Sequence, residues 1–249
     1  MTEHFPLRLV SSYMLAEACR HLVFERADGK PFAFAPGQFI QIHFHYPDGK
    51  ATKRSYSVAT IGAGDATPIQ HIEIAVSYVE GGAATALLSG LKEGDTVDAS
   101  GPYGRFCLFD ADANKRYLLV GTGTGITPYR AMLPQIRRVI EQRGCEVYVI
   151  FGARTERELL YGQDFIDFER HTPGFRFYSC FSREQRAVPR LYDRSGYVQN
   201  LLAELAPDPS GDIAYLCGNP NMVDQAFAQL KEAGLAVPHI RREKYISSK

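Results

Sequence analysis

The period of the apolar pattern changes once along this 249-residue chain, near Tyr117. Before that point, short alternating segments are separated by turns, a pattern typical of an antiparallel barrel or sandwich. After it, apolar strands alternate with helical segments, which predicts a parallel sheet with helices on both faces. The polar segment 110–115 lies between the two patterns and is the expected boundary. We therefore expect two domains, an antiparallel β-barrel over residues 1–110 and an α/β parallel-sheet domain over residues 111–249.

The first half holds four clear strand patterns. In one of them Ile72, Ile74 and Val76 share one face, while polar or small residues take the other. The four expected strands cover residues 39–44, 53–60, 71–79 and 96–100. A single helix is expected between the last two strands, over residues 84–91.

The second half alternates between the two element types. Its expected strands cover residues 117–120, 146–151, 175–181 and 213–217. Its helices are expected to end near residue 143, to span 156–170, to begin at 198 and to span 221–233. This order places the ends of several parallel strands at one edge of the sheet, where open α/β sheets bind their ligands.

Composition excludes several classes of function. The 28 basic and 28 acidic residues cancel, which argues against an electrostatically driven nucleic-acid binder. The apolar runs are too short for a membrane span, and the N-terminus does not read as a signal peptide. Five widely spaced cysteines without a C-x-x-C pair exclude the usual zinc and iron–sulfur spacings, so no metal is expected. We expect a soluble, cytoplasmic, monomeric protein.

A glycine-rich turn, G-T-G-T-G-I-T-P at 121–128, follows the first strand of the second half. Glycines let phosphate oxygens approach main-chain N–H groups, and a helix N-terminus attracts anions. Thr127 is expected to cap the next helix, with Pro128 in its first turn. The pattern favours phosphate binding, although a tight turn without a ligand has the same sequence requirements.

Arginines stand where an NAD-type site would carry an acidic residue for the ribose hydroxyls. Arg154 follows the second strand of this half, and Ser182 and Arg183 follow the third. Arg186, Arg190 and Arg194 come next in the chain. Forked guanidinium donors suit a phosphate monoester, which favours NADP(H) over NAD(H). The alternative is a solvated basic loop.

Five motifs occur in a fixed order along the whole chain. They are R-S-Y-S at 54–57, G-G-A-A-T at 81–85, G-P-Y-G-R-F at 101–106, the G-T-G-T-G-I-T-P turn and C-G-N-P-N-M-V at 217–223. In this order they resemble the ferredoxin–NADP reductase family in its compact bacterial form. The resemblance implies a barrel that binds FAD and an α/β domain that binds NADP.

The resemblance also implies roles for residues of the barrel. Arg54 would pair with the flavin pyrophosphate, Tyr56 would stack on the isoalloxazine ring, and Ser57 would reach flavin N5 as a catalytic residue. The remaining flavin contacts implied are Ser55, Ser77, Tyr78, Gly82, Ala83 and Thr85. Tyr245 would cover the exposed flavin face, but the family pattern is altered here because residues 246–249 follow it.

In the second domain the resemblance places Cys217 beside nicotinamide C4 as a catalytic residue that positions the ring. Thr124 would lie between flavin and nicotinamide. Ser182 and Arg183 would hold the 2′-phosphate, and Tyr197 would stack near the adenine. The remaining NADP contacts expected are Gly123, Gly125, Arg154, Arg194 and Gly218.

The expected activity is that of an FAD-dependent ferredoxin (or flavodoxin)–NADP(H) oxidoreductase. The one-electron acceptor is expected to be a separate protein or a small molecule, because the chain has no iron–sulfur ligand set. The basic docking face expected for it comprises Arg20, Lys50, Lys53, Arg241, Arg242 and Lys244. Two alternatives stay open: an NAD(P)H-dependent flavin reductase or detached reductase component of an oxygenase, and a non-catalytic redox sensor.

Overall fold

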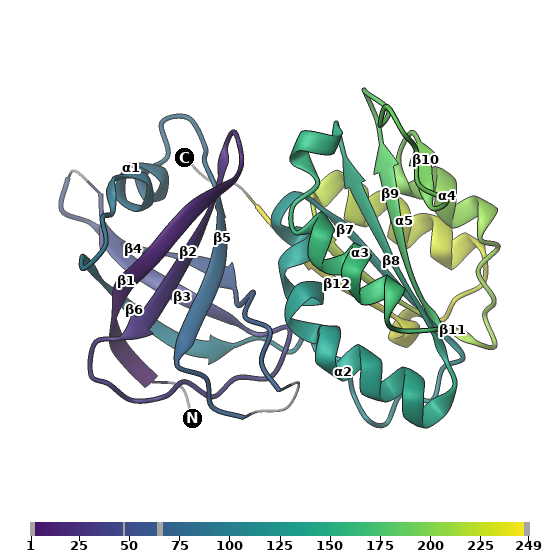
Figure 1. Ribbon diagram of the computed structural model, residues 1–249, viewed down its shortest axis with the longest axis horizontal. Helices are drawn as coiled ribbons and strands as arrows, with labels where there is room; N and C mark the ends of the chain where they lie inside the picture. Colours follow the sequence, from purple (N-terminus) through teal and green to yellow (C-terminus); the bar gives the residue numbers. More distant parts are fainter. Residues whose placement is uncertain (1–2, 47, 64–66, 247–249) are drawn as a thin grey trace. The chain divides into compact units, whose positions relative to one another are not determined.

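The computed structural model describes residues 3–46, 48–63 and 67–246 (Figure 1). The chain divides into two compact units. The first comprises the residues up to Leu108 together with Thr127–Gln135, and the second comprises Phe109–Ile126 with Ile136–Ile246. The first is built on an antiparallel sheet and the second on a parallel one, so the predicted fold class is confirmed.

The antiparallel sheet of the first unit has the order β4-β3-β6-β1-β2-β5. Its strands are β1 (Glu3–Ala16), β2 (Cys19–Arg26), β3 (Phe39–His45), β4 (Ala51–Ser57), β5 (His71–Ser77) and β6 (Thr96–Tyr103). The barrel closes between β4 and β5 through a bridge from Val58 to Ile74. In the same place the Ala59 N–H donates to the Glu73 carbonyl at 2.7 Å.

The barrel core follows from strand alternation. Ile72, Ile74 and Val76 are all buried, as their spacing predicts. The two long N-terminal strands, β1 and β2, are not among the predicted strands, although Leu7 and Leu9 alternate inward in the same way. Because polar and exposed residues fill much of the remaining length of β1, its apolar period is less obvious.

The predicted helix of the first half is α1 (Ala83–Gly90). Arg20 satisfies carbonyls at its C-terminal end, where its guanidinium donates to the Leu88 and Leu91 carbonyl oxygens at 3.0 Å each. Basic side chains stabilise helix C-termini in this way. Arg20 therefore stabilises the C-terminal end of α1, and its place on a docking face stays a prediction.

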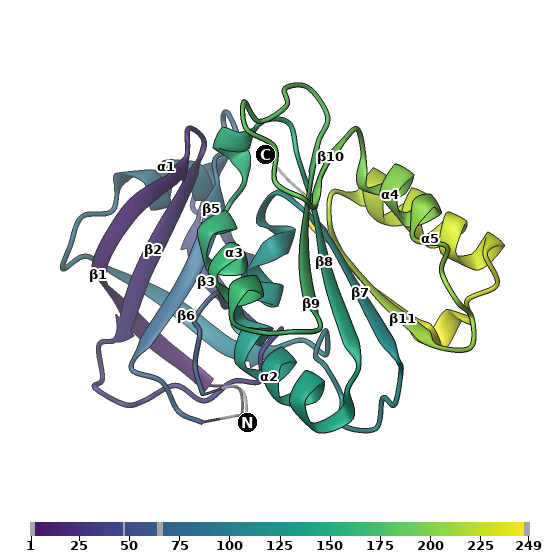
Figure 2. The same cartoon turned by 45° about the vertical axis from the view of Figure 1, so that its right-hand side comes forward.

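The parallel sheet of the second unit has the order β10-β9-β8-β7-β11-β12. Its strands are β7 (Arg116–Thr122), β8 (Glu146–Ala153), β9 (Phe175–Phe181), β10 (Asp193–Ser195), β11 (Asp212–Gly218) and β12 (Ile240–Lys244). The helices are η1 (Gly123–Ile126), α2 (Thr127–Arg143), η2 (Glu156–Glu158), α3 (Gly162–Arg170), α4 (Val198–Glu204), α5 (Pro220–Glu232) and η3 (Val237–His239). Figure 2 shows α3 and the C-terminal part of α2 on one face of this sheet and α4 and α5 on the other. The edge strands β10 and β12 are not among the predicted elements.

The helix expected over 156–170 is wrong in one respect. The segment forms the short η2 and then α3, with a break at Tyr161, whose φ is 55°. A left-handed backbone cannot continue a right-handed helix, so the first turn is separated from the rest.

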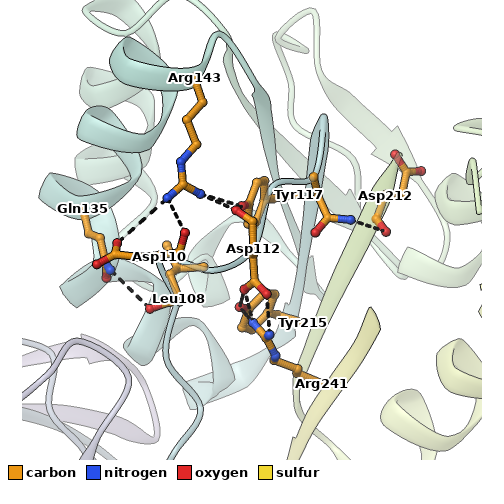
Figure 3. A network of polar contacts seen from close by, with 10 residues as sticks. Leu108, Asp110, Asp112, Tyr117, Gln135, Arg143, Asp212, Tyr215 and Arg241 are labelled. Carbon is orange, nitrogen blue, oxygen red and sulfur yellow. Dashed lines mark hydrogen bonds and ion pairs between the residues drawn. The ribbon is translucent and has the colours of Figure 1, made fainter. Parts of the chain in front are cut away.

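Asp112 ties the segment before β7 to the parallel sheet (Figure 3). Its carboxylate accepts hydrogen bonds from Arg241 at 2.5 and 2.7 Å and from the Tyr215 hydroxyl at 3.3 Å. Its carbonyl accepts from the Tyr117 hydroxyl at 3.0 Å and from Arg143. Arg241 is thus neutralised by Asp112 within this unit, which is a correction to the predicted docking face because that prediction counted Arg241 as an available cation.

Lys244 pairs with Asp224 at 2.7 Å, and the Arg242 guanidinium lies 3.9 Å from the centroid of the Phe227 ring. These partners belong to α5, so both basic side chains pack on that helix. Among the described residues, no helix has the length and apolar character needed to cross a membrane.

Candidate flavin and nucleotide sites

Strand β4 presents the R-S-Y-S motif with alternating faces. Arg54 and Tyr56 are half-buried on one face, while Ser55 is exposed and Ser57 is buried on the other. Burial raises the pKa of the Tyr56 phenol to about 12, so it stays neutral at physiological pH. The motif therefore offers a guanidinium and a flat aromatic ring side by side along one face.

The Arg54 side chain is held in place by its own neighbours. Its Nη2 donates to the Tyr46 hydroxyl at 2.9 Å, and its Nη1 donates to Thr52 Oγ1 at 3.1 Å and to the Lys53 carbonyl at 2.9 Å. A guanidinium has five N–H donors, so two remain without a partner among the described residues. The guanidinium also lowers the pKa of the Tyr46 hydroxyl by this hydrogen bond. Arg54 is thereby oriented and still able to bind an anion.

The N-terminus of α1 is open to an anion. Gly82 is the N-cap, no side chain caps the helix, and the first turn has no acidic residue. The Thr85 hydroxyl accepts a hydrogen bond from the Val79 N–H at 2.8 Å, which orients it and leaves its own proton able to donate to an anion. A Cβ at position 82 would lie 3.0 Å from the Val79 carbonyl oxygen, which explains the glycine. The free N–H groups that begin at Ala83 suit a pyrophosphate.

Strand β5 ends beside α1. Ser77 is exposed and hydrogen-bonds the Cys19 thiol, and Tyr78 is half-buried against the barrel core. The Tyr78 N–H donates to the Ala18 carbonyl at 2.8 Å. The first unit thus combines an aromatic face, an anchored arginine and an uncapped helix N-terminus. These groups fit FAD, which needs a stacking surface and donors for its diphosphate.

The glycine-rich turn forms η1 and continues directly into α2. Thr127 is the first residue of α2 and lies one position beyond the N-cap, which is Ile126 with helical φ and ψ. The Thr127 hydroxyl is buried and has no hydrogen-bond partner among the described residues. The predicted capping role is wrong because the turn is already helical before Thr127, which leaves no extended cap residue there.

The glycines of the two motifs are needed for different structural reasons. A Cβ on Gly125 would lie 2.3 Å from the Cys217 carbonyl oxygen, and one on Gly218 would lie 2.4 Å from the Thr122 carbonyl oxygen. Gly218 also has a φ of 121°, which other residues rarely adopt. Gly123 has a φ of 55° and open space around it. Gly125 and Gly218 therefore let β7 and β11 end against each other, whereas Gly123 leaves room for a ligand.

Cys217 is fully buried near the end of β11, and burial raises the pKa of its thiol well above the ordinary range. A thiol that does not ionise is no nucleophile, which agrees with a positioning role. The Tyr245 side chain hydrogen-bonds this thiol, and the Tyr245 N–H donates to the Gly218 carbonyl at 2.8 Å. Cys217 and Tyr245 thus lie together.

Glu243 is a third member of this cluster and is not among the predicted residues. It pairs in register with Cys217 across β11 and β12, and burial raises the pKa of its carboxyl to about 7. Sequence reasoning missed it because β12 is an edge strand whose partner is set by the fold. Its place two residues before Tyr245 was the only local signal.

The arginines at the strand ends fall into two groups. Three of them are held by protein groups. Arg186 lies 3.2 Å from a Glu156 oxygen, Arg190 lies 2.5 Å from a Glu169 oxygen, and Arg194 donates to the Leu191 and Asp193 carbonyls at 3.0 and 2.8 Å. These contacts stabilise the loop that precedes β10.

Arg154 and Arg183 form the second group, at the ends of β8 and β9. Arg183 is exposed and makes no ion pair within residues 3–46, 48–63 and 67–246. Arg154 pairs with Glu158 through its Nε at 2.8 Å and its Nη2. Ser182 is half-buried next to Arg183, and Tyr197 is 66% exposed at the N-cap of α4. An open glycine turn, a free guanidinium, a serine and an exposed ring fit a nucleotide with a phosphate monoester.

Asn219 is another residue that the sequence reasoning did not single out. Its side-chain oxygen accepts from the N–H groups of Asn221 and Met222, so it caps α5, and Pro220 occupies the first turn. Asn followed by Pro is a local signal for such a cap. The Asn219 N–H donates to Thr122 Oγ1 at 3.1 Å, which joins the two motifs of this unit.

Two family models match the chain. The oxidoreductase FAD-binding domain matches residues 6–107, and the oxidoreductase NAD-binding domain matches residues 119–227. Among curated proteins, a ferredoxin–NADP reductase B of Sorangium cellulosum is 36% identical over 98% of both chains. A propane 2-monooxygenase reductase component of Rhodococcus jostii is 29% identical over 87% of this chain, which spans only 56% of that protein.

Solved structures share the whole fold. A ferredoxin NADP+ reductase from Neisseria gonorrhoeae, crystallised with bound FAD and NADP, superposes with a TM-score of 0.81 at 22% identity. The superposition covers 97% of this chain and 98% of that one. At this identity the likeness concerns the fold, and the sequence relatives carry the family assignment.

Proposed function

This chain belongs to the ferredoxin–NADP reductase family, and from that premise we propose that it passes electrons from NADPH, through FAD, to a ferredoxin or flavodoxin. The observation that carries the proposal is the match over 98% of both chains to a ferredoxin–NADP reductase. FAD and NADP are its cofactors, since both binding domains match. We assign FAD to residues 1–110 and NADP to residues 111–249.

In the barrel, each residue would do one physical task. Arg54 would donate to the flavin diphosphate, and a hydrogen bond to a charged group contributes about 1.5–3 kcal/mol. Tyr56 would stack on the ring system, and Ser57 would hydrogen-bond flavin N5. Ser55, Ser77, Tyr78, Gly82, Ala83 and Thr85 would complete the flavin contacts. FAD supplies the chemistry that turns a two-electron donor into a one-electron donor.

In the α/β domain, Ser182 and Arg183 would bind the 2′-phosphate and Tyr197 would stack on the adenine. Cys217 would pack beside the nicotinamide as an un-ionised thiol, and Tyr245 would cover the flavin until the nicotinamide arrives. Gly123, Thr124, Gly125 and Gly218 would line the coenzyme, with Arg154 and Arg194 as further cationic groups. Both are already engaged, since Arg194 Nη1 donates to two carbonyls and Arg154 is paired with Glu158.

One alternative has a specific observation in its favour. The chain spans 56–62% of a propane 2-monooxygenase reductase component, a phenol hydroxylase P5 protein and an aromatic O-demethylase reductase subunit. This likeness to reductase components supports the alternative of a detached reductase component of an oxygenase. The full-length match to a stand-alone reductase favours the ferredoxin or flavodoxin assignment.

An anaerobic stopped-flow experiment tests the proposal. Purified protein with bound FAD is mixed with NADPH or with NADH, and flavin bleaching is followed. Reduced protein is then mixed with ferredoxin, flavodoxin or free FMN. We expect rapid bleaching by NADPH and reoxidation by a protein acceptor; bleaching by neither coenzyme, or turnover with free FMN alone, contradicts the proposal.

A further inference from the structure

A carboxylate occupies the arginine fork at the end of β8. Arg154 Nε donates to Glu158 Oε2 at 2.8 Å, and Arg154 Nη2 donates to Oε1 of the same carboxylate. The Arg154 main-chain N–H adds a contact to Glu158 Oε2 at 3.3 Å. The Nε–Nη2 edge is the one that binds a carboxylate or phosphate in bidentate fashion, and here it is already filled.

The neighbouring strand end brings the second arginine to the same place. The Arg183 N–H donates to the Arg154 carbonyl at 3.0 Å, and the Ser182 N–H donates to the Ala153 carbonyl at 3.0 Å. These bonds tie the ends of β8 and β9 together. The Glu158 carboxylate neutralises the charge of Arg154, and it also lies within electrostatic range of Arg183, because both arginines lower its pKa, Arg154 more strongly.

Such a carboxylate affects the two nicotinamide coenzymes differently. A 2′-phosphate carries a charge of about −1.5 to −2 at neutral pH, so Glu158 would repel it and compete with it for Arg154. A ribose 2′-hydroxyl carries no charge, and carboxylates at this strand edge accept hydrogen bonds from it in NAD-type sites. Glu158 therefore weakens the binding of NADPH and leaves the binding of NADH little changed.

We propose that Glu158 is a specificity-determining residue that acts through Arg154 and narrows the preference for NADPH over NADH. This inference rests on the proposed function, because it concerns the same coenzyme site. Arg183 and Ser182 hold the 2′-phosphate, and Arg154 contributes little while Glu158 occupies its fork. Removing the charge at position 158 releases Arg154 for the phosphate.

Equilibrium titration of the FAD-loaded protein with 2′,5′-ADP and with 5′-ADP tests this inference. In Glu158→Gln, 2′,5′-ADP should bind about three- to tenfold more tightly, as expected for one partly exposed charge acting on a phosphate, while 5′-ADP should change little. The matched control is Glu156→Gln, in the same η2 turn, whose carboxylate pairs with Arg186 instead. A merely structural role for Glu158 would shift both nucleotides alike.

A second variant keeps the result interpretable. Arg154→Met should weaken 2′,5′-ADP binding more in the Glu158→Gln background than in the wild type, because only there is the Glu158 negative charge removed from the Arg154 guanidinium. FAD content and melting temperature establish that each variant is folded, and Glu158→Ala repeats the test without the amide. Unchanged or weaker 2′,5′-ADP binding in folded Glu158→Gln overturns the inference. A wild-type protein that binds neither nucleotide overturns the proposed coenzyme as well.

Discussion

Glu243 makes the stability of this protein depend on pH in a direction opposite to that of most carboxylates. Burial raises the pKa of its carboxyl from 4.5 to about 7, so the folded chain keeps a proton that the unfolded chain releases above 4.5. The stabilisation from this proton is complete below pH 4.5 and is lost as the pH rises through 7. A pKa difference of this size corresponds to about 3 kcal/mol.

Replacement of Glu243 by glutamine removes the titration and keeps the size of the side chain. Relative to the wild type, Glu243→Gln should gain up to about 3 kcal/mol between about pH 5 and pH 8. For a chain of this length that is a difference of about 6–12 °C in melting temperature. Thermal unfolding of the FAD-loaded protein across this pH range measures it.

The exposed carboxylate of Glu232, at the end of α5, provides the control. Glu232→Gln should follow the wild-type curve at every pH. If the difference in melting temperature between Glu243→Gln and wild type does not change with pH, Glu243 does not titrate in the folded protein as its burial requires.

Three further outcomes follow from the geometry. Gly125→Ala should destabilise the protein by about 3 kcal/mol, because its Cβ would lie 2.3 Å from a carbonyl oxygen. Gly123→Ala, which places its Cβ in open space, should destabilise it by only about 1 kcal/mol. Equal melting temperatures of the two variants would contradict the packing argument. Arg54→Met should weaken FAD binding about 10- to 100-fold, measured by fluorescence titration of the apoprotein, and unaltered affinity would remove Arg54 from the flavin site. Cys217 should resist iodoacetamide in the native protein and react after unfolding, as mapped by mass spectrometry, and rapid native labelling would show that the thiol is not buried.

The sequence predicted those features that depend on residues close together in the chain, such as which face of a strand a side chain occupies. The alternation of β4 correctly separates Arg54 and Tyr56 from Ser55 and Ser57, because neighbouring side chains on any strand point to opposite faces. The strand expected over 175–181 matches β9, where a nearly continuous buried run is typical of a parallel strand covered on both faces.

Other features depend on partners that lie far away in the sequence. Threonine is a residue type that often caps helices. The turn before Thr127 is already helical, however, so Thr127 is part of the helix and does not cap it. Arg190 pairs with Glu169 across 21 residues, and Arg241 pairs with Asp112 across 129. Sequence spacing does not reveal such pairs, and a cluster of arginines therefore reads as an anion site even where most of it is neutralised.

Helix α2 limits how the protein can be dissected. Its first half belongs to the first compact unit, where Ala131 packs in the barrel core and Arg130 binds the Glu73 carboxylate at 2.6 Å and the Ala59 carbonyl at 2.7 Å. A truncated gene that stops after Leu108 would remove the Arg130 guanidinium from Glu73 and open the core at Ala131. Chimeric reductases that borrow this barrel would have to import the opening turns of α2 with it, although those turns are encoded after the start of the nucleotide module.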